Sequence, residues 1–287
     1  VKKKPGFVAS VVTTMGLTLG ALLCILTLAY VLLVKPLPYP NQNSLYTVEH
    51  QLIDKDSKVD GQAFTYPNLM HLYKNQQVFE QSTLLYFDAD VLQSQASNPT
   101  VQLSFITPQW FNLLDASMAL GRTFESSEGV DTNNPVAILS YKTWKNEFNL
   151  DSDILTKKVV FSDISYQIVG VLSETFIEPE LLDTGMKTEV FLPWDYNSIS
   201  ASERKKWGND DGGLMFMGKL KPSLSQSQVN QSLTKLISEN WQDNVSGHEF
   251  FKGWGINIKL HTLKSVLLRG SEETVYLLLA GVVGLVL

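Results

Sequence analysis

The feature that most constrains this chain is an uncharged stretch near its start. Residues 7–34 contain no Asp, Glu, Lys or Arg, and the stretch is longer than the roughly 20 apolar residues that a helix needs to cross a bilayer. A cleaved signal peptide is the alternative, but its apolar core is about 7–15 residues long and ends at a small-residue cleavage site. Here Val34 runs directly into Lys35 and Pro36. The stretch therefore predicts a transmembrane helix.

The charges that flank this stretch predict its orientation. Three lysines occupy positions 2–4, and only Lys35 follows closely on the other side; cytoplasmic flanks are the ones that carry an excess of Lys and Arg. We therefore expect the N-terminus in the cytoplasm and residues 35–274 outside it. Residues 275–287 are again uncharged, but they are too few to span a bilayer. We expect them to begin a second membrane helix of a longer polypeptide.

The composition excludes several classes of protein. The chain has 287 residues, with 23 Lys and Arg against 29 Asp and Glu, so it carries no basic stripe that would replace the counterions of a nucleic acid. Its single cysteine rules out an intramolecular disulfide and a Cys-x-x-Cys motif. The length predicts one or two domains.

The segment between the uncharged ends has the mixed pattern of an α+β fold. Pro36, Pro38 and Pro40 alternate and predict a stiff, extended lead, because proline fixes φ and favours an extended residue before it. Strands are predicted at residues 45–51, 82–91, 100–106, 136–139, 158–161, 166–172, 189–192, 214–220 and 256–260. Helices are predicted at residues 66–75, 107–114, 141–148 and 225–241. The last helix is the best specified, since Ser225 and Gln228 form a capping box.

Patterns that could carry catalytic chemistry are weak. Gly213 and Lys219 fit G-x-x-x-x-G-K, but Leu220 stands where a Ser or Thr would hold Mg²⁺, and the apolar residues between them alternate like a buried strand. Ser202 and Ser232 each have a lysine three residues on, without the S-D-N and K-T-G motifs of penicillin-binding enzymes. We therefore predict neither a nucleotide site nor a nucleophilic serine.

The histidines and the acidic residues form no metal motif either. The histidines are His50, His71, His248 and His261. None has a second His or Cys at the spacing of a zinc site. One acidic cluster comprises Glu174, Glu178, Glu180 and Asp183. It lacks the alternating oxygens and the glycine of a calcium loop. The chain is therefore predicted to have no catalytic, metal-binding or cofactor-binding residue.

Small and polar residues in the first uncharged stretch predict a helix contact. Gly16 and Gly20 form G-x-x-x-G, which allows close approach of a second helix in a membrane, and Thr13 and Thr27 add polar atoms that prefer a protein neighbour.

Short motifs along the chain together resemble a known family. KPGF at residues 4–7 leads into the apolar stretch and KPLPYP at 35–40 leaves it. Further on stand ITPQWF at 106–111, LGRTF at 120–124, VAILSYKTW at 136–144, YQIVGV at 166–171 before Phe176, and FLP at 191–193. In order and spacing these resemble the first membrane helix and extracytoplasmic core of MacB-like, FtsX-like ABC transporter permeases. Asn149-Leu150 and Thr156-Lys157 replace turn residues common in the family.

The resemblance implies a discontinuous organisation. It predicts a membrane-anchored α+β periplasmic domain in which a porter-like α/β subdomain is interrupted by a β-rich subdomain. The expected divisions are 1–34 for the cytoplasmic start and first membrane helix, 35–106 and 214–262 for the porter-like subdomain, 107–213 for the insertion, and 263–287 for a connector and a second membrane helix. The strands at 45–51 and 214–220 should then share one sheet.

The resemblance also implies partners. The chain would be a non-catalytic permease subunit of the bacterial inner membrane, acting in export or substrate handling, with a cytoplasmic ABC ATPase that binds ATP, a second permease copy, a periplasmic adaptor and membrane lipid. The alternative from the topology alone is the extracytoplasmic sensor domain of a two-span signalling receptor; a membrane-tethered hydrolase lacks a convincing nucleophile and base.

The connector to the second membrane helix has a helical pattern. Leu263, Val266 and Leu267 repeat at i, i+3 and i+4, which predicts one apolar face of a short helix. We expect it to act as a rigid lever between membrane and domain, the alternative being a plain connector.

Overall fold

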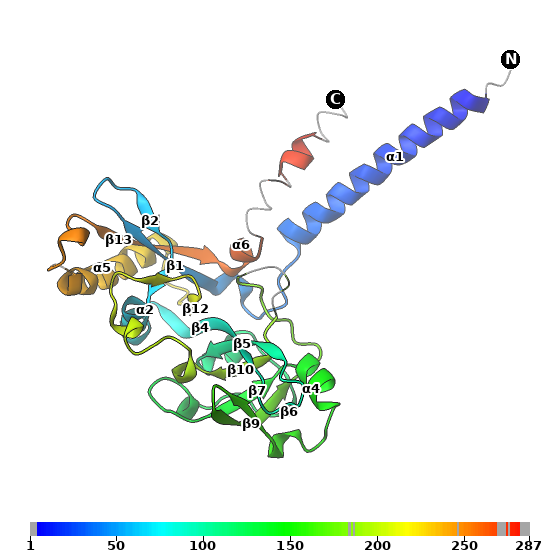
Figure 1. Cartoon of the computed structure of the whole chain (residues 1–287). Helices are drawn as coiled ribbons and strands as arrows, with labels where there is room; N and C mark the ends of the chain where they lie inside the picture. The colour runs from blue at the N-terminus through cyan, green and yellow to red at the C-terminus, as the bar shows by residue number, and fades with distance from the viewer. Residues whose placement is uncertain are drawn as a thin grey trace. The chain divides into compact units, whose positions relative to one another are not determined.

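The computed structural model describes residues 5–182, 185, 187–245, 247–268, 274 and 276–281. It forms two compact units, residues 1–37 with 264–287 and residues 38–263 (Figure 1).

The first unit contains one long apolar helix. Helix α1 (Pro5–Ala29) continues as a π-helical turn (Tyr30–Val34), and within the described residues Gly6–Val34 is the one helix long and apolar enough to cross a membrane. The predicted apolar helix is confirmed, and its crossing of a membrane stays a prediction. It ends at Lys35 because Pro36 has no N–H and holds the residue before it extended, and Lys35 has ψ of 128°. Of the predicted second span, residues 276–281 are helical, and 275 and 282–287 lie outside the described residues.

The second unit is built on one mixed sheet. Its main path runs through β13 (Gly255–Thr262), β1 (Leu45–Ile53), β12 (Leu214–Leu220), β4 (Phe79–Val91), β5 (Thr100–Ile106), β10 (Val190–Pro193), β7 (Val136–Leu139), β9 (Ile164–Leu172) and β6 (Met118–Gly121). Beside it, β2 (Val59–Gly61) pairs with β1 and β8 (Lys158–Phe161) pairs with β9, while β3 (Phe64–Thr65) and β11 (Asp210–Asp211) form a separate pair. The β5–β10 and β7–β9 pairs are parallel, which gives the α+β class with a mixed sheet.

Strands from both ends of this unit lie side by side. As predicted, β1 pairs with β12, with Thr47 opposite Met217. On its other side β1 pairs with β13 from Tyr46 opposite Thr262 to Ile53 opposite Gly255. Because the pair is antiparallel, β1 begins where β13 ends.

Helix α5 (Gln226–Val245) covers this end of the sheet together with α2 (Tyr66–Asn75) (Figure 1). Its buried residues recur every fourth position: Val229, Leu233, Ile237, Trp241 and Val245. The predicted capping box is present, since Gln228 N donates to Ser225 Oγ at 3.4 Å and Ser225 N donates to Gln228 Oε1 at 3.1 Å. The buried apolar residues of α5 pack on apolar residues of β1, β12 and β13.

Polar side chains of α5 seal the outer edge of β13. Asn230 Oδ1 accepts from Leu260 N at 3.1 Å, and Thr234 Oγ1 accepts from Ile258 N at 2.9 Å. Gln226 and Ser238 donate to the carbonyls of Leu260 and Ile256. Four helical residues rise about 6 Å and two strand residues about 6.8 Å, so helix side chains spaced by four match strand groups spaced by two. The sealed edge leaves fewer backbone groups for pairing with another chain.

The other end of the sheet has its own core. Apolar residues of β5, β7, β8, β9 and β10 pack there with Phe148 of α4 (Tyr141–Phe148), whose first turn is capped by Ser140 accepting from Thr143 N at 3.1 Å. One continuous sheet joins both cores, and β5 pairs with β10 across the expected 106/107 division. The division of the chain into 1–34, 35–106, 107–213, 214–262 and 263–287 stays a prediction. Two further short helices are α3 (Gln109–Leu113) and α6 (Leu263–Leu268).

Candidate functional site

The weak catalytic patterns fall on ordinary structural elements. The G-x-x-x-x-G-K run lies largely in β12, where Phe216 and Met217 are buried, whereas a phosphate loop needs a turn ahead of a helix. Ser232 and Lys235 lie exposed on α5, where Lys235 faces Glu239 at 3.9 Å. Ser202 immediately precedes a 3₁₀ turn that contains Lys205.

The histidines remain apart, and no group of His, Cys, Asp and Glu in the described part of the chain is placed to hold a metal ion. His50 is buried under α2: its Nδ1 lies 2.8 Å from Ala63 O and its Nε2 lies 3.1 Å from Asn68 Nδ2. Burial lowers the pKa of His50 to about 4. The neutral ring therefore donates from Nδ1 and accepts at Nε2. His261 lies on β13 and pairs with Glu49 of β1 at 2.5 Å.

The acidic cluster holds a loop in place. Glu178 accepts from Thr188 N at 2.8 Å and from Thr188 Oγ1 at 2.5 Å, and Glu180 pairs with Lys187 at 2.7 Å; Asp183 lies outside the described residues. Burial raises the pKa of Glu178 against the effect of these hydrogen bonds. Tyr39, from the proline-rich lead, is buried, and its pKa is raised first by that burial and then by the charges of Glu178 and Glu180.

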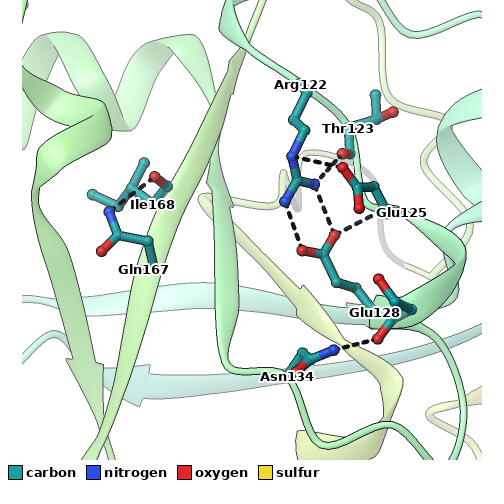
Figure 2. A network of polar contacts seen from close by, with 8 residues as sticks. Arg122, Thr123, Glu125, Glu128, Asn134, Gln167 and Ile168 are labelled. Atoms are coloured by element: carbon teal, nitrogen blue, oxygen red, sulfur yellow. Dashed lines mark hydrogen bonds and ion pairs between the residues drawn. The ribbon is translucent and has the colours of Figure 1, made fainter.

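Figure 2 shows a second polar network, after β6. Arg122 donates from both Nη atoms to the Glu128 carboxylate at 2.8 Å, Glu125 N donates to the same carboxylate at 2.7 Å, and Arg122 Nη1 also donates to Thr123 O. Glu128 is buried. Burial alone would raise the pKa of Glu128, but the bonds from Arg122 and Glu125 N and the Arg122 charge lower it below its ordinary value.

A third network fixes the loop that follows. The Asp195 carboxylate accepts from the backbone N–H groups of Asp131, Thr132 and Asn133 at 2.9, 2.7 and 3.0 Å. Lys74 of α2 pairs with Asp131 at 2.8 Å. Together with the Arg122–Glu128 pair, this network orders the connection between β6 and β7.

The unit of residues 38–263 also has a cleft of about 730 Å³ between α4 and residues 172–189. Lys142, Lys145 and Lys187 line it, and so do Glu174, Glu178 and Glu189, beside the apolar Phe176 and Ile177. Both lysines and glutamates line the described part of the cleft, so its charges favour neither an anionic nor a cationic ligand.

The chain thus combines one long apolar helix with an α+β domain whose charged side chains form structural polar networks. Residues 10–236 match the family model of the MacB-like periplasmic core domain. The chain belongs to this family, the periplasmic domain of MacB-like ABC transporter permeases, which is non-catalytic. This confirms the resemblance seen in the motifs.

Two solved structures have a similar fold. A domain of a protein described as a permease from Porphyromonas gingivalis is 14% identical, with a TM-score of 0.56 over 79% of this chain and 92% of that one. The periplasmic region of MacB from Actinobacillus actinomycetemcomitans is 16% identical, with a TM-score of 0.51 over 78% and 91%. No curated protein sequence matches this chain.

The family motifs occupy defined places in the fold. The segment at 136–144 forms β7 and the start of α4, and the segment at 166–171 lies in β9. Arg122 of the L-G-R segment is the partner of Glu128. Sequence reasoning missed Glu128 and Asp195. Only Glu128 left a signal, because Glu125 three residues before it completes a capping box.

Proposed function

We propose that this chain is the permease subunit of an ABC transporter of the bacterial inner membrane, and that residues 38–263 pass ATP-driven motion of the membrane helices to export or substrate handling in the periplasm. The chain supplies no nucleotide site in this proposal, and ATP is bound by a separate cytoplasmic ATPase. Family membership of residues 10–236, continuous with the apolar helix Gly6–Val34, supports the proposal.

The observation that carries the coupling role is the pairing of β1 with β13. Tyr46 lies opposite Thr262, so the chain enters and leaves this domain at the same end of two hydrogen-bonded strands. A displacement of either connection therefore acts on the same strand pair. A domain held this way moves as a rigid body rather than deforming locally.

The two connections differ in how they are stiffened. Three alternating prolines limit the backbone freedom of residues 36–40. On the other side α6 forms the expected short helix, with Leu263 buried and Val266 and Leu267 half-buried. Residues 269–273 lie outside the described residues, and continuity of the lever into a second membrane helix stays a prediction.

The remaining partners also belong to the proposal. An ideal Cβ at Gly16 or Gly20 meets no atom within 4 Å, so this face of α1 has room for a second permease copy. A periplasmic adaptor and membrane lipid complete the set of partners.

An insertion tests the coupling role. A Gly-Ser linker placed after Lys264 in the full-length permease, assayed together with its ATPase, should abolish transport while ATP hydrolysis continues. The same linker placed after Asp56, in the exposed turn between β1 and β2, is the matched control and should leave transport unchanged. Normal transport with the linker after Lys264 would sink the proposal.

A further inference from the structure

Lys264 reaches the end of the first helix from a distant part of the sequence. Its Nζ donates to Leu33 O at 2.7 Å and to Lys35 O at 3.3 Å. All three residues belong to the unit formed by residues 1–37 and 264–287. The contact therefore joins the two segments through which the chain passes between this unit and the next.

The carbonyl of Leu33 lies in the last turn of the helix, where carbonyls have no intrahelical donor. This turn is π-helical, and Lys35 N closes it by donating to Tyr30 O at 2.8 Å, five residues back. Lys264 supplies a side-chain donor to Leu33 O.

The setting makes this bond stronger than an exposed lysine contact. The end of a helix carries about half a negative charge on its free carbonyls, which favours a cation there. Lys264 is half-buried.

We infer that Lys264 is a positioning residue for transport: it ties the connector after β13 to the outer end of the first membrane helix, so that both connections move together. The inference rests on the proposed function for its consequence, because tied connections matter only if motion is passed through them. Without the tie, each membrane segment would displace its own strand end independently.

Substitutions at Lys264 separate the tie from general stability. With Lys264→Met, which removes the donors and keeps the apolar stem, transport per ATP hydrolysed should fall about tenfold, the loss expected for one charge-assisted bond. Lys264→Arg should keep most of the coupling. The matched control is Lys259→Met, at an exposed position of β13, which should behave as the unaltered protein. Normal coupling in Lys264→Met would overturn the inference.

A distance measurement judges the tie without any transport assay. Spin labels at Val34 and Leu268 in the full chain, held in lipid nanodiscs, should give a narrow distance distribution in the unaltered protein and with Lys264→Arg. The distribution should broaden with Lys264→Met and with Lys264→Gln, and an unchanged one would overturn the tie. If the linker after Lys264 leaves transport normal while these distributions broaden, the proposed function fails and the tie stands. If the linker stops transport but Lys264→Met does not, the tie alone fails.

Discussion

The two ends of the sheet in residues 38–263 are built differently. At the attached end, β13, β1 and β12 come from both ends of the unit, pair antiparallel and are covered by α5. At the far end, β10, β7, β9 and β6 come from the middle of the chain and include a parallel pair, and their connecting loops are held by the carboxylates of Glu128 and Asp195.

The two ends therefore differ in what holds them together beyond their apolar cores. The attached end has a strand edge sealed by polar side chains of α5. The far end has charged groups that fix its connecting loops. The variants below test whether the two ends lose stability separately.

The largest effect should come from the packing of α5. Trp241 is buried near the C-terminal end of α5, and its Nε1 donates to Trp207 O at 3.0 Å. Trp241→Ala should lower the free energy of unfolding by about 3–5 kcal/mol, measured by denaturant titration, with Trp241→Phe losing less. If the free energy of unfolding fell by less than about 1 kcal/mol, the packing of α5 would not be what stabilises the attached end.

Acid should weaken the attached end first. The pKa of His50 is lowered from 6.5 to about 4 by burial. Between these two pH values the unfolded chain therefore binds a proton at His50 that the folded chain does not bind. Stability should therefore be complete above pH 6.5 and fall as the pH drops from 6.5 to 4, by at most about 3 kcal/mol. His50→Gln should remove this slope. An unchanged slope would place the titrating group elsewhere.

Neutralising Glu128 should affect the far end. Glu128→Gln removes a buried charge that Arg122 pairs with, and should cost about 2 kcal/mol, seen as faster amide exchange in residues 125–134 and not in β1. Glu125→Gln is the matched control, because its carboxylate is 60% exposed and should contribute little. Because the pKa of Glu128 is lowered, its contribution should be present above the ordinary glutamate pKa and lost below it. If amide exchange in β1 became faster by the same factor as in residues 125–134, the two ends of the sheet would unfold as one cooperative unit.

The smallest effect should come from the sealed edge. Thr234→Val keeps the shape of the side chain but removes the acceptor of Ile258 N, and should cost about 1 kcal/mol with faster exchange at the Ile258 amide. Ser232→Ala, on the exposed side of α5, serves as the control. If the Ile258 amide in Thr234→Val exchanged at the same rate as in the unaltered protein, Thr234 would not seal the edge of β13.

The long elements of this fold follow from local sequence. The apolar stretch, the capping box of α5 and the helix after Ser140 give clear signals because their partners lie within a few residues. The run 45–51 predicted most of β1, and its pairing with β12 followed from the family resemblance. The short strands β2, β3, β6 and β11 left no signal, since they depend on neighbours distant in the sequence.

Side-chain contacts between distant segments were the least predictable features. Asp195 binds the N–H groups of residues 131–133, more than sixty positions earlier, and Lys264 reaches Leu33 across 231 positions. The periodicity of apolar residues along the sequence gives no sign of such distant pairs. The prolines after the first helix predicted only a stiff, extended lead, whereas the side chain that reaches the end of this helix depends on the fold.

The most direct test of the account is the side of the membrane on which residues 38–263 lie. Cys24 would be replaced by Ala, and single cysteines placed at the exposed Ser127 and at Lys3. In intact cells with a permeable outer membrane, an impermeant maleimide should label Ser127→Cys, and Lys3→Cys only after the inner membrane is opened. Labelling of Ser127→Cys only after the inner membrane is opened would contradict the account.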